Sequence, residues 1–182
     1  MKNNKEIFWI TRTAIFIALL VVLQAATASL GNQFITGSIV NMMLVVSVMT
    51  CGLASGLTVA SVSSVMAKLL GIGPLWSLIP FMIAGNITLV LIWHFIGNRN
   101  ISKNKFAAYI TALIIAAIMK FAVLYIGIVK IAVPVLLKLP APQATVISGI
   151  FSFPQLITAT IGGVIAVIIF PRLKKAFEKG IK

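Results

Sequence analysis

The sequence predicts an all-α integral membrane protein, a compact bundle of six transmembrane helices. Of its 182 residues, 60% are hydrophobic and only 9% are charged, whereas about a quarter of the residues in a typical soluble domain are charged. The apolar residues lie in long runs, which glycine, proline and short polar segments separate. Because a bilayer core about 30 Å thick needs about 20 apolar residues per helix, each run can be assigned to one or two spans.

The first half of the chain predicts three helices. The first apolar run ends at the polar segment Gly31-Asn32-Gln33. The next run, over residues 39–70, is too long for one comfortable span, and Gly52 and Gly56 lie near its middle. We therefore expect a tight hairpin of two short helices there. The expected helices cover residues 8–30, 39–51 and 53–70.

The second half of the chain predicts three more helices. Gly71-Ile72-Gly73-Pro74 separates the third helix from the fourth, because glycine and proline end helices. A polar, basic loop over residues 98–105 follows the fourth helix, and a stiff connection from Pro134 to Pro142 follows the fifth. Pro171 is expected to stop the last helix. The expected helices cover residues 75–96, 106–129 and 145–170, and residues 1–182 are expected to form a single transmembrane domain.

The basic residues predict the orientation of this bundle, since six spans place both termini on one side of the membrane. Of the 15 Lys and Arg residues, Lys68, Lys120, Lys130 and Lys138 would lie in the other half, and the remaining eleven on the side of the termini. Cytoplasmic loops are enriched in Lys and Arg, so both termini are expected in the cytoplasm. Because these residues flank apolar spans and form no soluble basic face, membrane lipid is expected as a partner and nucleic acid is not.

Two lysines lie inside apolar runs of a chain whose only acids, Glu6 and Glu178, lie in its terminal tails. Ionisable side chains at membrane depth usually face a bundle interior or a wet cavity. An anionic ligand would supply the counter-charge that Lys68 and Lys120 lack within the chain. Lys68 lies near a helix end, so extension of its ammonium to the lipid headgroups is an equal alternative. Lys120 lies about two helical turns from water, so its side chain is expected to face the interior of the bundle, toward a ligand or water.

Each of the six expected helices also places one polar side chain in the outer half of the bundle. A few polar groups in an otherwise apolar pocket are typical of a small-molecule site, although hydrogen bonds between helices are the alternative explanation for the amides. The candidate substrate-binding residues are Lys120, Lys68, Asn41, Asn86, Gln155 and Gln24, with Phe34, Trp76, Tyr125 and Phe151 as apolar walls.

The sequence gives enzyme chemistry little support. It has one histidine, His94, one cysteine, Cys51, and no acid in the spans, so a metal site, a carboxylate pair and an acid-oriented triad are not expected. We expect no catalytic residue, no metal and no cofactor. Ser64 lies one turn before Lys68, which leaves a small membrane enzyme with a serine-lysine dyad as one alternative. A structural or assembly subunit of a membrane complex is another.

A surface for a partner helix is visible near the N-terminus. Ala14 and Ala18 lie one turn apart, and pairs of small residues at this spacing let another helix approach closely. The approaching helix belongs either to a partner protein or to the same bundle. The sequence contains no P-loop, so energy from ATP would have to come from a different protein.

Three short features carry a family resemblance. They are the basic N-terminal tail, the segment Thr13-Ala14-Ile15-Phe16-Ile17-Ala18-Leu19, and the segment Phe153-Pro154-Gln155-Leu156-Ile157 followed by Gly162-Gly163. With six helices in fewer than 200 residues, they resemble the S components of energy-coupling factor (ECF) vitamin transporters, which are the substrate-binding membrane subunits. The resemblance in architecture covers the whole chain.

The resemblance implies a multi-pass protein of a prokaryotic plasma membrane that binds a vitamin with high affinity in the outer half of the bundle, beneath a loop at residues 31–38. Its implied partners are a transmembrane coupling protein, which Ala14 and Ala18 would contact, and two cytoplasmic ABC ATPases. Substrate residues vary among S components and are not transferred. The uncompensated lysines instead favour an anionic vitamin, of the pantothenate, lipoate, niacin or folate class.

Overall fold

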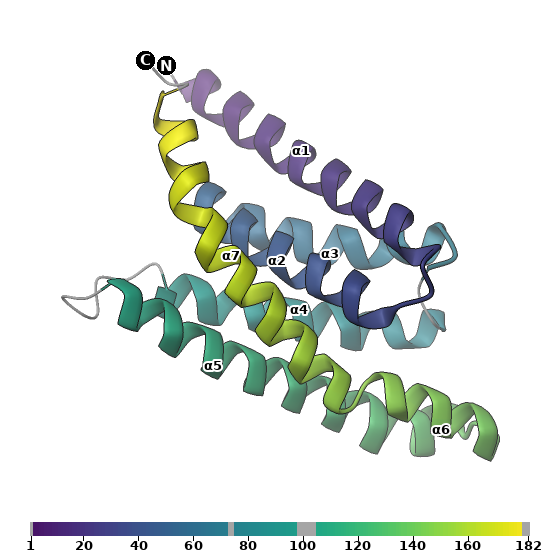
Figure 1. Cartoon of the computed structure of the whole chain (residues 1–182). Helices are drawn as coiled ribbons and strands as arrows, with labels where there is room; N and C mark the ends of the chain where they lie inside the picture. The colour runs from purple at the N-terminus through teal and green to yellow at the C-terminus, as the bar shows by residue number, and fades with distance from the viewer. Residues whose placement is uncertain (1, 73–74, 98–104, 180–182) are drawn as a thin grey trace.

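The computed structural model describes residues 2–72, 75–97 and 105–179, and these residues form helices and turns without any strand. Figure 1 shows the arrangement of the helices. The α-helices are α1 (Lys2–Ala28), α2 (Gln33–Cys51), α3 (Leu53–Leu69), α4 (Ile79–Ile92), α5 (Lys105–Leu124), α6 (Ala141–Ile150) and α7 (Phe153–Lys179). The shorter segments are the 3-10 helix η1 (Trp76–Leu78) and the π-helical η2 (Trp93–Gly97) and η3 (Tyr125–Leu137).

These segments form the six rods of a membrane bundle, which confirms the predicted fold class. Five are long and apolar enough to cross a membrane, and these are Glu6–Ala28, Gln33–Cys51, Trp76–Gly97, Lys105–Leu137 and Ala141–Leu173. The sixth, α3, has 17 residues, about 25 Å at 1.5 Å per residue. The expected hairpin of two short helices is present, because α2 and α3 meet at Gly52, whose φ of 87° is open mainly to glycine.

The rods share two ends, which we name for what they carry. α1 begins and α7 ends at one end, together with the junction of α2 and α3, and we call this the terminal end (Figure 1). The opposite end carries the turn between α1 and α2, the start of α4 and the hairpin of η3 and α6, and we call it the loop end. The placement of the terminal end in the cytoplasm stays a prediction.

The structure differs from the sequence expectation at the prolines. α5 and η3 form one helical rod that includes Pro134, so no stiff connection begins there. α6 starts at Ala141 instead of residue 145, and α7 continues through Pro171 to Lys179. A proline in a membrane helix removes one N–H, and neighbouring groups can satisfy the carbonyl that this leaves. The expected loop at residues 98–105 falls on residues 98–104, which lie outside the described part of the chain, as do Gly73 and Pro74 of the preceding connection.

The turn between α1 and α2 is shorter than the loop implied over residues 31–38. Asn32 caps α2, because its side-chain oxygen accepts hydrogen bonds from the backbone N–H of Phe34 at 2.9 Å and of Ile35 at 3.4 Å. An asparagine cap satisfies donors that the first helical turn would otherwise leave unpaired. The helix therefore starts at Gln33, six residues earlier than expected from the apolar run.

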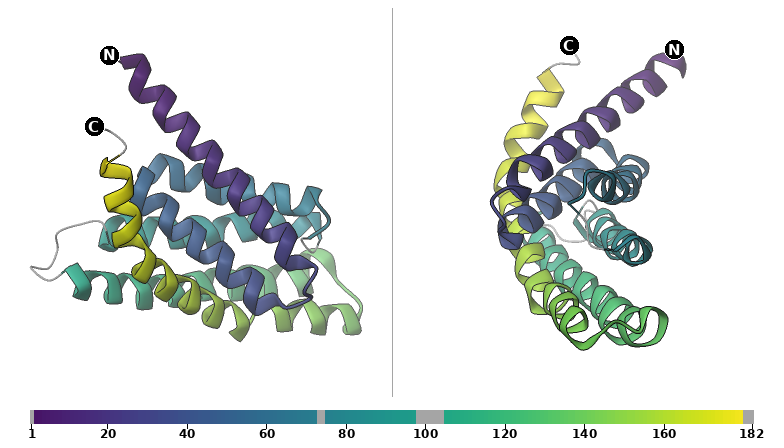
Figure 2. Two further views of the ribbon diagram at one scale, coloured as in Figure 1. Left: turned by 45° about the horizontal axis from the view of Figure 1, so that its top comes forward. Right: turned by 90° about the vertical axis from the view of Figure 1, so that its right-hand side faces the viewer.

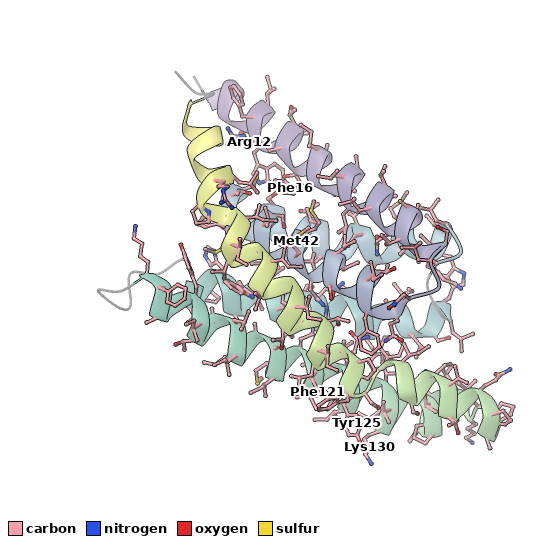
Figure 3. All side chains as sticks on the ribbon, in the orientation of Figure 1. Arg12, Phe16, Met42, Phe121, Tyr125 and Lys130 are labelled. Atoms are coloured by element: carbon pink, nitrogen blue, oxygen red, sulfur yellow. The ribbon has the colours of Figure 1, made fainter. Side chains whose placement is uncertain are left out.

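The centre of the bundle is α2, which packs against α1, α3, α4 and α7. Its approach to α7 is very close, since a Cβ atom added to Gly162 would lie 2.5 Å from the backbone oxygen of Ser38 and 2.7 Å from Cβ of Asn41. α1 lies at the periphery, away from α5 and α6, as the end view in Figure 2 shows. Phe16 of α1 packs in the same core as Met42 of α2 (Figure 3).

One buried hydrogen bond joins α1 to α3. The hydroxyls of Thr13 and Ser55 are 2.7 Å apart, and Thr13 donates to the carbonyl of Trp9 at 2.8 Å, so Ser55 is the donor between the two hydroxyls. We expect Thr13→Val to lower the free energy of unfolding by about 0.5 to 1.5 kcal/mol. Denaturant titration in mixed micelles measures this loss. The double variant Thr13→Val/Ser55→Ala removes both hydroxyls. Its loss of unfolding free energy should be smaller than the sum of the losses in the two single variants.

The control for this prediction is Thr111→Val. Thr111 is exposed on α5 and bonds only the carbonyl of Ala107 in its own helix, at 2.9 Å. An equal loss of unfolding free energy in Thr111→Val would contradict the importance of the hydrogen bond between α1 and α3. Additive losses in the double-mutant cycle of Thr13 and Ser55 would contradict it as well.

Candidate functional site

A cavity of about 760 Å³ lies in the half of the bundle nearer the loop end. All six rods contribute to its wall, from Gln24 of α1 to Gln155 of α7. Most of the lining is apolar, with residues such as Met82, Leu124 and Phe151. This volume lies within the range of about 300 to 1000 Å³ that is typical of small-molecule sites.

Lys120 of α5 lies at the wall of this cavity and is only 3% exposed. Its ammonium donates to Oδ1 of Asn41 on α2 at 2.5 Å and to Oδ1 of Asn86 on α4 at 2.6 Å. Both asparagines also line the cavity and are buried. An ammonium can only donate, so the amide oxygens face it and the amide nitrogens face outward from it.

The outward amide nitrogens extend this contact into a network. Asn86 donates to the hydroxyl of Ser64 on α3 at 3.0 Å, and Asn41 donates to the hydroxyl of Thr158 on α7 at 3.3 Å. Each hydroxyl in turn donates to a carbonyl of its own helix, Ser64 to Ala60 and Thr158 to Gln155. The buried network therefore joins every rod except α1 and fixes the position of the ammonium.

The electrostatic balance of the cavity is unusual for a buried lysine. Among the described residues that line it there is no Asp and no Glu, so two amide dipoles alone face the cation. A buried charge without a full counter-charge costs several kcal/mol. Two of the three ammonium protons are used by Asn41 and Asn86, which leaves one for a ligand. The arrangement suits an anionic group beside Lys120.

The structure brings together five of the predicted polar residues and leaves the others apart. Lys120, Asn41, Asn86, Gln24 and Gln155 line the one cavity. Their role in substrate binding stays a prediction.

Of the four predicted apolar walls, Phe151 lines the cavity. The others, together with Lys68, are not among the described residues of the lining. Lys68 is half-buried near the end of α3, while Phe34 and Trp76 are exposed at the loop end. Tyr125 stacks on Phe121 with ring centroids 5.5 Å apart, and the ammonium of Lys130 lies 5.5 Å from its ring centroid. Figure 3 shows Phe121, Tyr125 and Lys130 together at the edge of the bundle.

The sequence reasoning missed an amide contact at the break between α6 and α7. The side-chain nitrogens of Gln33 and Gln155 both donate to the carbonyl of Ile150, at 2.8 and 3.2 Å. In a continuous helix the N–H of residue 154 would occupy this carbonyl, but residue 154 is proline and has no N–H. The spacing of Ile150 and Pro154 was the signal for an unpaired carbonyl. Nothing in the sequence pointed to Gln33 as its partner.

The hydrogen bonds of Ser64 do not support the alternative of an enzyme with a serine-lysine dyad. Ser64 donates to the carbonyl of Ala60 at 3.0 Å and accepts from Asn86, so its hydroxyl proton is not directed at a lysine. The described residues contain no group of three His, Cys, Asp or Glu side chains that could hold a metal ion.

Ala14 and Ala18 are exposed on α1, on the face that points away from the rest of the bundle. Large apolar side chains surround them, with Ile15 58% and Leu19 46% exposed. Thr13, Phe16 and Leu20 occupy the buried face of the same helix. Packing of the alanine pair within the bundle is therefore not what the structure shows, and a partner helix stays a prediction.

A membrane bundle with a cavity of this size and a buried cation at its wall is typical of membrane proteins that bind small molecules. Residues 9–174 match the family model described as "ECF transporter, substrate-specific component". The chain belongs to this family, which confirms the resemblance inferred from its sequence, and it is a membrane substrate-specific subunit of an ECF transporter. A comparison with curated proteins found no match, and a comparison with solved structures found none either.

The family also bears on partners and chemistry. Its members are substrate-binding subunits of transporters and not enzymes, and they work with a small-molecule substrate and with the membrane and ATPase components of the transporter. The five long apolar rods are those of a multi-pass membrane protein.

Proposed function

We propose that this subunit binds a small anionic micronutrient of the pantothenate, lipoate, niacin or folate class with high affinity and delivers it to an ATP-driven uptake complex. The observation that carries the proposal is Lys120, a buried cation that two amide oxygens hold at the wall of a cavity without a described carboxylate. Gln24 and Gln155 supply further polar contacts. Residues 1–182 act as one transmembrane domain.

The orientation that fits this proposal places the loop end outside a prokaryotic plasma membrane and both termini in the cytoplasm. Most of the basic residues then lie in cytoplasmic segments, as expected for short loops and tails. The cavity opens in the outer half of the bundle, where it can take up substrate before the complex presents it to the cell interior.

The partner surface that we propose is the exposed face of α1 around Ala14 and Ala18. Small side chains let a helix of the coupling protein approach closely, and two cytoplasmic ABC ATPases bound to that protein would supply the energy. This surface is separate from Lys120, so binding and coupling can be tested independently.

The test is ATP-dependent uptake into liposomes that contain the subunit, a coupling protein and two ATPases. We expect Ala14→Trp and Ala18→Trp to reduce uptake and co-purification at least about tenfold, since a bulky side chain prevents close helix packing. Ligand affinity of the isolated subunit should stay unchanged. Val146→Trp is the matched control, because Val146 is 62% exposed on α6, far along the chain from α1.

Two results would contradict the proposal. Full uptake in both alanine variants would remove α1 as the coupling surface. Absence of both ligand binding and complex formation in the unchanged protein would leave a structural or assembly role as the better description.

A further inference from the structure

The charge of the cavity limits the charge of its ligand. Lys120 is the only charged side chain among the described residues of the lining. One cation can neutralise one negative charge, and a second buried negative charge would carry an uncompensated desolvation cost. A single carboxylate matches Lys120, whereas a phosphate dianion or a dicarboxylate exceeds what the cavity offers.

A second group of polar side chains lines the cavity nearer the loop end. These are glutamines, whose amide oxygens are hydrogen-bond acceptors. Gln33 and Gln155 point their side-chain nitrogens at the carbonyl of Ile150. Because a carbonyl only accepts, this contact fixes the orientation of both amides. Neither Oε1 atom has a hydrogen-bond partner among the described residues, and both residues line the cavity. We call Gln24, Gln33 and Gln155 the amide end.

Gln24 also leaves a hydrogen-bond acceptor at the amide end without a donor among the described residues. It is 7% exposed, lines the cavity, and its Oε1 is buried without a hydrogen-bond partner in the part of the chain that the structure describes. A buried acceptor that stays unpaired costs about 1 to 3 kcal/mol. A ligand hydroxyl or N–H would satisfy it, whereas a carboxylate would place another acceptor there.

Gln33, at the amide end, is separated along α2 from Asn41, which contacts Lys120. Gln33 and Asn41 lie eight residues apart on α2, which corresponds to about 12 Å along the helix. Apolar residues such as Val40 and Leu124 line the wall of the same cavity. A ligand that reaches both ends must be elongated.

We infer that the substrate is an elongated monocarboxylate, with its carboxylate at Lys120 and hydroxyl or amide N–H donors at Gln24, Gln33 and Gln155. The inference rests on the proposed function and narrows its class of anion. Among anionic ligands, the inference favours monocarboxylates that carry hydrogen-bond donors. It disfavours monocarboxylates with an apolar tail and anions with two acidic groups.

The experiment is a calorimetric comparison of four probes with the purified full-length protein. Pantothenate carries one carboxylate with hydroxyl and amide donors, and pantothenol is its uncharged alcohol analogue. Lipoate has one carboxylate and an apolar tail, and folate has two carboxylates. We expect pantothenate to bind at least about 30-fold more tightly than pantothenol, which lacks the charge. It should also bind at least about tenfold more tightly than lipoate and folate, which leave the amide end unpaired or place a charge there.

Variants of the amide end test the location of the donors. Gln155→Leu and Gln33→Leu should weaken pantothenate about five- to tenfold and leave lipoate unchanged. Lipoate serves as an internal standard, since a folding defect would weaken both ligands. Gln143→Leu is the matched control, because Gln143 is exposed on α6 and is not among the described residues of the lining.

The outcomes separate this inference from the proposed function. Tightest binding of lipoate or folate, equal binding of pantothenol, or equal loss of both ligands in the glutamine variants would overturn the inference. Failure of all four probes to bind would overturn it as well. ATP-driven uptake of any anionic micronutrient would still support the proposed function in each of these cases.

Discussion

Replacing Lys120 with methionine is expected to weaken binding of the anionic substrate by about 2 to 5 kcal/mol, or about 30- to 5000-fold in Kd. Methionine keeps much of the length and apolar character of the side chain, so the variant removes the charge with little change in packing. The carboxylate of the ligand would then be buried beside the amides of Asn41 and Asn86 without a cation. Titration of the purified protein with pantothenate, lipoate, nicotinate and folate measures the loss.

Lys68→Met is the control for this prediction. Lys68 carries the same charge inside an apolar run, but it is not among the described residues of the cavity wall, so its replacement should leave Kd within about twofold. Thermal unfolding of both variants without ligand would show whether either is misfolded. Unchanged affinity in a folded Lys120→Met protein would remove the charge argument.

The second large effect is expected at Gly162, where α7 crosses α2. A Cβ atom there would lie 2.5 Å from the oxygen of Ser38 and 2.8 Å from the nitrogen of Met42, and both atoms belong to the backbone. Backbone cannot move aside as a flexible side chain can, so Gly162→Ala must separate the helices. We expect a loss of about 3 kcal/mol or more in the free energy of unfolding, at the upper end of the usual cost of overpacking. Thermal unfolding in detergent measures the loss.

The same change should also weaken ligand binding, because Cβ of Asn41 lies 2.7 Å from the added atom. Gly149→Ala is the matched control, since an added Cβ there would meet nothing within 4 Å. Alanine also has the higher helix propensity, so this variant should be as stable as the unchanged protein or slightly more stable. Equal melting temperatures for the two variants would contradict the close approach of α2 and α7.

The sequence was sufficient for the fold class and for five of the polar residues that line the cavity, but not for Gln33. Membrane depth is apolar, so a side chain such as Lys120 or Asn86 stands out by its chemistry alone. The rotation of each helix about its axis was not predictable, because packing sets it. Phe34 and Trp76 were expected as walls for their size, yet they lie on exposed faces.

The predicted helix ends were least accurate at the prolines. Pro134 was expected to begin a stiff connection and Pro171 to end the last helix, but both lie within helical rods. Pro154 instead lies in the first turn of α7, just after the break from α6, and leaves the carbonyl of Ile150 to side-chain donors. Sequence alone does not show which proline finds neighbours to satisfy the carbonyl that it leaves unpaired.

The polar network that omits α1 has an evolutionary consequence. Lys120, Asn41 and Asn86 lie on α5, α2 and α4, whereas the exposed face of α1 around Ala14 and Ala18 makes no contact in their network. Substitutions on α2, α4 and α5 could therefore retune the chemistry of the cavity while leaving the outer face of α1 intact. Descendants of one ancestral bundle could diverge in nutrient choice and still fit the same transport machinery.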